Sequence, residues 1–297
     1  MSLLGSLPGR GGDDLETLEA GLDALETTTA SRTSRGRKVL SAGWPPLLAL
    51  ALLLGVWQLL FAAKVKPAYA LPSPGSVWSS LVEQVGNGTL PGAVATSLRR
   101  GGLGFLASLA IGTPLGLVIA RVRPVRRAIG PLVSGLQSLP SVAWVPAAII
   151  FFGFSEAAIY AVVLLGAVPS IANGMVSGID QVPPLYSRVG RVLGARGLTA
   201  ARFVLLPAAL PGYVGGMRQG WAFSWRSLMA AELIAVSPDL GLGLGGLLDE
   251  GRQLSDMSLV FAGIIAILFV GIAVELCLFA PLERRVLRRR GLLGAAS

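Results

Sequence analysis

The apolar positions of this chain gather in long runs instead of alternating with polar positions. A helix that crosses the hydrocarbon core of a bilayer needs about 20 mainly apolar residues. Reading with that window predicts six spanning helices, at about residues 44–63, 98–120, 132–152, 157–178, 205–236 and 257–280. The pattern therefore predicts an all-α membrane protein whose transmembrane domain covers residues 44–285.

Two of the predicted elements depart from a simple span. The fifth run is longer than a bilayer requires, so we expect part of it outside the hydrocarbon, or a kink near Pro207 and Pro211. Between the first two runs, Leu71-Pro72-Ser73-Pro74-Gly75 precedes a segment with apolar residues at helical spacing. That spacing predicts a short helix lying in the membrane surface.

The composition agrees with a bilayer as the solvent. The 297 residues are 53% hydrophobic and only 14% charged, whereas an ordinary soluble domain is about one quarter charged. The chain has one cysteine, Cys277, and no histidine. A disulfide framework, a histidine metal site and a Cys/His nucleophile are therefore excluded, and we expect no catalytic residue, metal or cofactor.

The net charge of +9 is concentrated beside the ends of the apolar runs. Arginine clusters alternate with loops that are poor in basic residues, so the positive-inside rule predicts that both termini are cytoplasmic. Residues 1–43 are then a mostly disordered cytoplasmic tail, and residues 286–297 a basic one. Arg99 and Arg100 are the exception, since they lie near the outer end of the second span and must snorkel or pair.

The cytoplasmic loop 180–206 is long, and its pattern predicts two short helices separated by Gly194. Leu185, Val189, Val192 and Leu193 form one apolar stripe, while Arg188 and Arg191 face away from it. Such a hairpin can dock its stripe in a groove of a soluble partner. The alternative is an interfacial helix held by anionic lipid.

This loop resembles the coupling motif of importer-type ABC transporter permeases. Gly194 is followed, after nine residues, by Val204, Leu205, Leu206 and Pro207, as in the family motif. The family motif opens with Glu-Ala-Ala, whereas this chain has Arg188-Val189-Gly190, so a basic residue replaces an acidic one. The resemblance implies that the ATPase-coupling residues are Arg188, Val189, Gly190, Arg191, Leu193, Gly194, Val204, Leu206 and Pro207.

Further motifs resemble the permeases for nitrate, aliphatic sulfonates and taurine. They occur in the family order over about residues 71–285, and they are Leu71 to Pro74, Leu139 to Pro146, Phe152 to Phe154 with Glu156, Gly190 to Gly194, and Ala231-Glu232 followed by Gly241 to Gly243. The resemblance implies a subunit of the bacterial cell membrane that works with ATP-binding ABC ATPase subunits, an extracytoplasmic solute-binding protein and a second permease copy.

The residues support this division of labour independently. None of the three lysines lies in a Gly-x4-Gly-Lys-Ser/Thr loop, so the chain does not bind ATP through a P-loop. The energy for uphill transport must come from another chain or from an ion gradient. The glycine-rich stretch 241–246 follows a spanning helix on the outer side and does not fit a dinucleotide loop.

Charged residues inside spans are candidates for function because burying them is costly. Arg218, Arg226 and Glu232 all fall in the fifth run, too far apart along one helix to neutralise one another. Either they contact an anionic substrate in the translocation pathway, or they are fixed in ion pairs with other helices.

Two other classes of protein compete with an ATP-driven permease. An ion-gradient-driven carrier or channel needs an inverted repeat or a carboxylate relay, for which Glu232 alone is a poor candidate. An intramembrane enzyme needs clustered nucleophiles or carboxylates, and the sequence shows none. The pattern leaves open which solute is carried and whether the permease pair contains identical chains.

Overall fold

The computed structural model describes residues 35–67 and 69–289, which fold into two compact units, residues 1–59 and 60–297. Most of the predicted N-terminal tail and of the predicted C-terminal tail lies outside the described residues. In the first unit, α2 (Arg35–Ala62) begins before the predicted start of the first span at residue 44, since an apolar window locates the greasy part of a helix and not its end. The apolar part of α2, Leu47–Ala62, is short.

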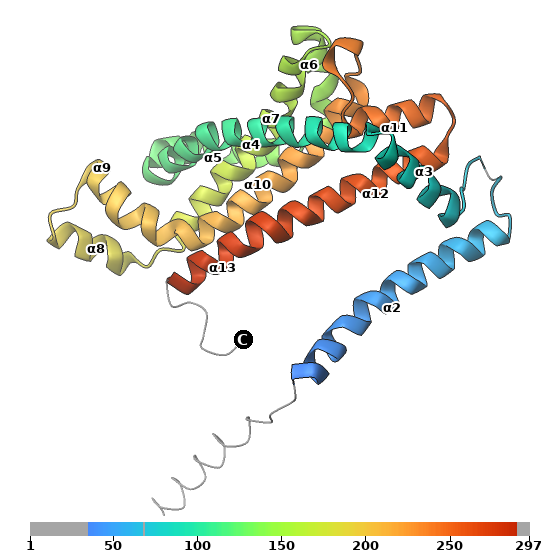
Figure 1. Ribbon diagram of the computed structural model, residues 1–297. Coiled ribbons are helices and arrows are strands. Elements are labelled where there is room, and N and C mark those ends of the chain that lie inside the picture. The colour runs from blue at the N-terminus through green and yellow to red at the C-terminus, as the bar shows by residue number, and fades with distance from the viewer. Residues whose placement is uncertain (1–34, 68, 290–297) are drawn as a thin grey trace, which may run out of the picture. The chain divides into compact units, whose positions relative to one another are not determined.

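The second unit is a helical bundle, and the described residues contain no strand. Figure 1 shows α4 and α10 running along one another with α12 beside them. Its elements are α3 (Pro74–Gly86), α4 (Thr89–Arg121), α5 (Arg123–Ser138), η1 (Ser141–Trp144), α6 (Val145–Phe152), α7 (Glu156–Asp180), α8 (Pro184–Val192), α9 (Gly197–Ala200), η2 (Ala201–Leu205), α10 (Leu206–Ile234), η3 (Pro238–Leu240), α11 (Leu244–Gln253), α12 (Met257–Val274), η4 (Glu275–Phe279) and α13 (Ala280–Arg289).

The prediction of six straight spans is corrected at two places. Among the described residues, three helices are long and apolar enough to cross a membrane: α4, α7 and the continuous stretch Met257–Arg289. The predicted span 132–152 is broken, because α5 ends at Ser138 and the chain bends by 100° before α6. Pro140 follows the break, and a proline disfavours helical geometry in the residue before it.

The predicted fifth span corresponds to η2 and α10. These residues form a helix that is long enough to cross a membrane, but its charged residues keep it outside the apolar class. Pro207 and Pro211 do not break it: Pro207 lies in its first turn, where a proline removes no helical hydrogen bond, and the helix continues through Pro211 to Ile234. A π-helical turn, Ala201–Leu205, precedes them.

Small residues at every fourth position hold the bundle together. They recur on the three central helices as Gly104, Ser108, Gly112 and Gly116 of α4, Gly166, Ser170, Gly174 and Gly178 of α7, and Gly212, Gly216, Gly220 and Ser224 of α10. In the membrane the hydrophobic effect does not drive helices together, so close packing of small residues does. A Cβ on Gly216 would lie 2.4 Å from the Cα of Gly174, so this crossing tolerates no side chain.

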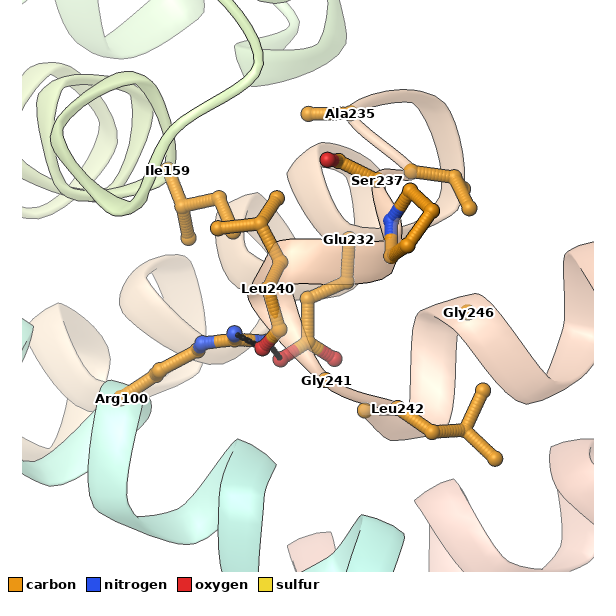
Figure 2. A pocket seen from close by; sticks show the side chains of 12 residues that line it. Arg100, Ile159, Glu232, Ala235, Ser237, Leu240, Gly241, Leu242 and Gly246 are labelled. Atoms are coloured by element: carbon orange, nitrogen blue, oxygen red, sulfur yellow. Dashed lines mark hydrogen bonds and ion pairs between the residues drawn. The ribbon is translucent and has the colours of Figure 1, made fainter.

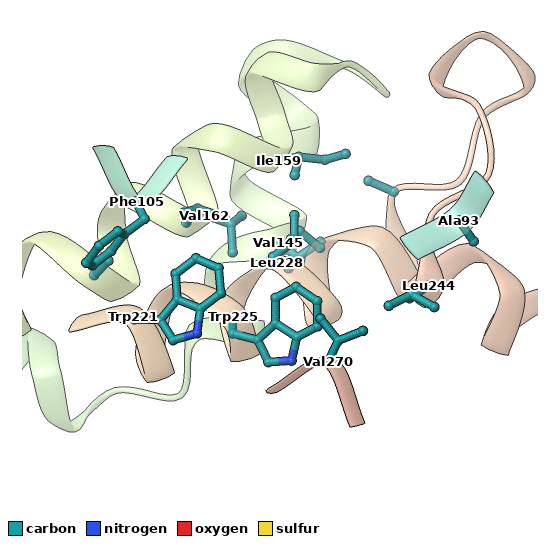
Figure 3. Close-up of a cluster of buried hydrophobic side chains, with 14 of the residues drawn as sticks. Ala93, Phe105, Val145, Ile159, Val162, Trp221, Trp225, Leu228, Leu244 and Val270 are labelled. Carbon is teal, nitrogen blue, oxygen red and sulfur yellow. The ribbon is translucent and has the colours of Figure 1, made fainter. Parts of the chain in front are cut away.

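Beside this contact lies an aromatic cluster (Figure 3). The rings of Trp221 and Trp225 stack at 5.9 Å, and Phe105 of α4 meets Trp221 edge to face at 5.5 Å. Phe279 of η4 packs against the same ring of Trp221. The cluster therefore joins the C-terminal stretch of the chain to the central helices.

The close contact of α7 with α10 leads to a test on neighbouring glycines. We expect Gly216→Ala to destabilise the folded protein by about 2 kcal/mol, because overpacking at the Gly174 backbone forces the helices apart. The matched control is Gly215→Ala, whose Cβ meets nothing within 4 Å. Thermal unfolding in detergent measures both, and equal melting temperatures for the two variants would contradict the contact.

Candidate functional site

The loop between α7 and α10 folds into a hairpin that projects beyond the central helices, with α8 and α9 at its tip (Figure 1). Pro184 lies in the first turn of α8, which ends at Val192. Gly194 then reverses the chain with φ +83°, a backbone angle that glycine adopts without strain. Gly190 is buried against Val204, and a Cβ there would lie 3.0 Å from the Val204 side chain. The hairpin is thus closed onto the base of α10, which begins at Leu206 and Pro207.

The outer face of the hairpin is apolar and uncovered within the described chain. Val192 is 86% exposed and Leu193 is 80% exposed, and Val189 and Leu185 are exposed as well. Arg188 and Arg191 are also exposed. The structure therefore brings the predicted coupling residues together on one hairpin, with an apolar face available to a partner.

At the opposite end of α10, a buried ion pair joins α4 to α10 (Figure 2). Arg100 is only 1% exposed, and its Nη1 lies 3.1 Å from Oε1 of Glu232. Its Nη2 donates to the carbonyl oxygen of Leu240 in the loop after α10. Its Nε lies 3.4 Å from Oε1 of Glu156 at the start of α7. One guanidinium thus links three helices and a loop.

The second oxygen of Glu232 holds the start of α11. Ser97 donates its hydroxyl to Oε2 of Glu232 at 2.6 Å, and the backbone N–H of Gly245 donates to the same oxygen at 3.1 Å. The N–H of Leu244 donates to the Ser97 hydroxyl at 2.8 Å. A carboxylate is favoured here because the first N–H groups of a helix have no helical partners. A Cβ on Gly243 would lie 2.5 Å from this carboxylate, which explains the glycine at that position.

Arg99 and Arg100, the exceptions to the charge pattern, are both paired. Nη2 of Arg99 lies 2.8 Å from Oε1 of Glu156, so Glu156 serves both arginines. A cavity of about 310 Å³ lies beside the buried pair and is lined by Arg100, Glu232 and the loop residues Ala235 to Gly243. The polar cluster is therefore a structural joint with solvent access at its side.

Beyond this joint, α11 carries a second buried carboxylate, Asp249. The guanidinium of Arg252 donates to Oδ1 of Asp249 at 3.1 Å, and the side-chain amide of Gln253 donates to Oδ2. Hydrogen bonding to Arg252 is the main cause that lowers the pKa of the Asp249 carboxyl, and burial opposes it. This carboxylate is therefore ionised at neutral pH.

The structure does not bring the three predicted pathway residues together. Arg218 pairs instead with Glu275 at 2.5 Å and with Glu283 at 3.4 Å. Arg226 is exposed, with its guanidinium 4.9 Å from the ring centroid of Phe223. Of the three residues, Arg226 therefore has no ion-pair partner among the described residues.

Sequence reasoning missed the neutral polar contacts inside the bundle. The side-chain amide of Asn173 on α7 donates to Gln137 of α5 at 2.6 Å, and Thr113 of α4 is hydrogen-bonded to Tyr213 of α10. Their only signal in the sequence is a polar residue inside an apolar run. Within the described residues, no group of three or more His, Cys, Asp or Glu side chains is placed to hold a metal ion.

A helical membrane bundle with a projecting apolar hairpin and no appended soluble domain in its described part defines a membrane transport subunit. Residues 112–288 match the family of the binding-protein-dependent transport system inner membrane component. The chain belongs to this family, the membrane permeases of ABC importers. ATP hydrolysis therefore resides on a separate ATPase subunit, a solute-binding protein delivers the solute, and the alternative of an ion-gradient-driven carrier is not supported.

Curated relatives agree along most of the chain. It is 31% identical over 262 residues to a protein of Bacillus subtilis (strain 168) named as an aliphatic sulfonates transport permease, SsuC, covering 88% of this chain and 92% of that one. It is 31% identical over 242 residues to the taurine transport system permease protein TauC of Escherichia coli (strain K12), with 80% and 86% covered.

A cyanobacterial relative and a solved structure extend the comparison. The nitrate import permease protein NrtB of Leptolyngbya laminosa is 30% identical over 241 residues, with 79% of this chain and 84% of that one covered. A chain of the inward-facing MetNI methionine ABC transporter superposes with a TM-score of 0.56 at 20% identity, covering 65% of this chain and 94% of that one. This structural likeness confirms the importer permease fold.

The buried ion pair gives a second test. We expect Glu232→Gln to destabilise the protein by about 3 kcal/mol, because it leaves the buried Arg100 short of a countercharge and weakens the hold on α11. Melting temperature and folded yield in detergent measure the effect. Glu250→Gln, an exposed change on α11, is the control. If both variants melt together, Glu232 is not the joint described here.

Proposed function

We propose that this permease carries a small anion, an aliphatic sulfonate, taurine or nitrate, through a pathway between two copies of the chain. The support comes from the relatives, which are named for these solutes and match 76–88% of the chain. It comes also from the motif order over residues 71–285. Residues 44–285 form the permease domain, the tails 1–43 and 286–297 are cytoplasmic, and the basic hairpin faces the cytoplasm under the positive-inside rule.

The observation that carries the coupling proposal is the projecting hairpin with its exposed apolar face. Val189, Val192 and Leu193 present that face to an ATPase, and Arg188 and Arg191 form its basic rim. Movement of the ATPase reaches the bundle because Gly190 packs directly on Val204, next to the start of α10. The transmission is a rigid-body movement of packed elements.

For the pathway itself we propose unequal roles for the three charged residues of α10. Arg226 is exposed and free of a carboxylate among the described residues, so its guanidinium is available to a passing oxyanion. Arg218 is held by Glu275 and Glu283, and releasing it requires a change at η4 and α13. Glu232 supports the pathway by holding the outer ends of α4 and α10 in place.

A turn mutation tests the coupling hairpin. We expect Gly194→Val to uncouple solute uptake from ATP hydrolysis while the protein remains in the membrane, because a β-branched residue is strained at φ +83°. Gly194→Asn is the matched control, since asparagine tolerates this region. Uptake and ATP hydrolysis are measured in proteoliposomes with the ATPase and the binding protein. Full uptake by the valine variant would count against the hairpin.

A charge mutation tests the pathway. We expect Arg226→Gln to lower anion uptake by about tenfold, which corresponds to one lost charge-assisted contact, and Arg226→Lys to retain part of it. Labelled taurine, an alkanesulfonate and nitrate are compared as solutes. ATPase association must stay unchanged, as shown by copurification. Uptake by Arg226→Gln at the wild-type rate for all three solutes would remove Arg226 from the pathway.

A further inference from the structure

The hairpin has a second surface, which faces the C-terminal end of α4. A cavity of about 300 Å³ lies there, between α4, α8 and η2. Arg121, Arg191 and Arg196 line it together with Ser187, and Ala200, Val204 and Leu205 form an apolar wall. The cavity is distinct from the exposed stripe of Val189, Val192 and Leu193, which we assign to the ATPase.

The arginines around this cavity lack acidic partners among the described residues. Arg121 donates to the carbonyl oxygen of Gly197 at 3.3 Å, and Arg191 donates to the carbonyl oxygen of Ser187 at 3.3 Å. Both acceptors are neutral. Ion pairing leaves Arg196 free within the same part of the chain.

The sequence offers no nearby carboxylate to compensate this charge. Between Asp180 and Glu232 it contains no acidic residue at all. Asp180 is itself engaged, since both of its carboxylate oxygens accept from Arg126, one at 2.9 Å and the other at 2.5 Å. The cavity therefore concentrates positive charge, and like charges that share a site are stabilised by an anion between them.

The chemistry and the position favour a phosphate group. Guanidinium forks match phosphate oxygens in bidentate geometry, and the Ser187 hydroxyl adds a further donor. Arg121 is the last residue of the spanning helix α4, so the cavity lies where that helix leaves the hydrocarbon, at the level of the lipid headgroups. Basic pockets between helices on the cytoplasmic side of membrane proteins bind anionic headgroups.

We propose that this cavity binds a phosphate group, either of an anionic phospholipid headgroup or of free inorganic phosphate. The proposal rests on the proposed function only for the inward orientation of the hairpin. A bound phosphate bridges Arg121 at the end of α4 to Arg191 and Arg196 in the hairpin. It thereby fixes the hairpin against the bundle and makes coupling sensitive to anionic lipid.

The experiment compares two pairs of charge deletions in the purified complex of permease and ATPase. Arg121→Gln with Arg196→Gln removes two cavity arginines. Arg123→Gln with Arg127→Gln removes the same charge from the start of α5, outside the residues that line the cavity. Each complex is placed in nanodiscs of phosphatidylcholine alone or mixed with phosphatidylglycerol, and bound phosphatidylglycerol is counted by native mass spectrometry. A parallel arm titrates the complex in phosphatidylcholine with inorganic phosphate.

We expect the cavity variant to bind phosphatidylglycerol about tenfold more weakly than the α5 variant. Should inorganic phosphate bind instead, with the same difference between variants, the site holds and its ligand is the free ion. Equal binding of both ligands by the two variants overturns the proposal. Loss of the ATPase from the cavity variant alone also overturns it, since the arginines would then serve the partner protein.

ATPase copurification and ATP hydrolysis by the wild-type complex are measured in the same samples. If the wild-type chain fails to hold an ATPase, the proposed coupling fails, while phosphate binding by the permease is still counted. The two failures are therefore distinguishable.

Discussion

The buried pair of Arg100 and Glu232 is the constraint on which the outer half of the bundle depends. A charged side chain at 1% exposure is stable only when paired and fully hydrogen-bonded. Here the guanidinium reaches Glu156, Glu232 and the backbone of Leu240, and the carboxylate of Glu232 accepts from Ser97 and Gly245. Through this single network the ends of α4, α7, α10 and α11 are held in one arrangement.

Below this joint the bundle relies on contact instead of charge. Small residues on α4, α7 and α10 let the backbones meet, and Gly174 touches Gly216 closely. At the far end the same principle fixes the hairpin, where Gly190 meets Val204. A hairpin packed this tightly moves with α10, which is what an ATP-driven permease needs from a coupling element.

The two faces of the hairpin divide its chemistry. The exposed apolar stripe on α8 suits a protein partner, and the cavity with Arg121, Arg191 and Arg196 suits a phosphate. The basic residues that sequence analysis assigns to membrane orientation therefore serve a more local purpose as well. Arg126 is an example, because it is consumed by a two-point contact with Asp180 and leaves the cavity arginines uncompensated.

The sequence by itself determined the helical class, the apolar runs and the turn at Gly194, because hydrophobic length and backbone permissiveness are local properties. It also required partners for Arg100 and Glu232. Which partners they found was decided by the tertiary structure, since residues 132 positions apart meet only after packing. The same holds for the 100° bend between α5 and α6, where a continuous apolar run hides a change of direction that depends on neighbouring helices.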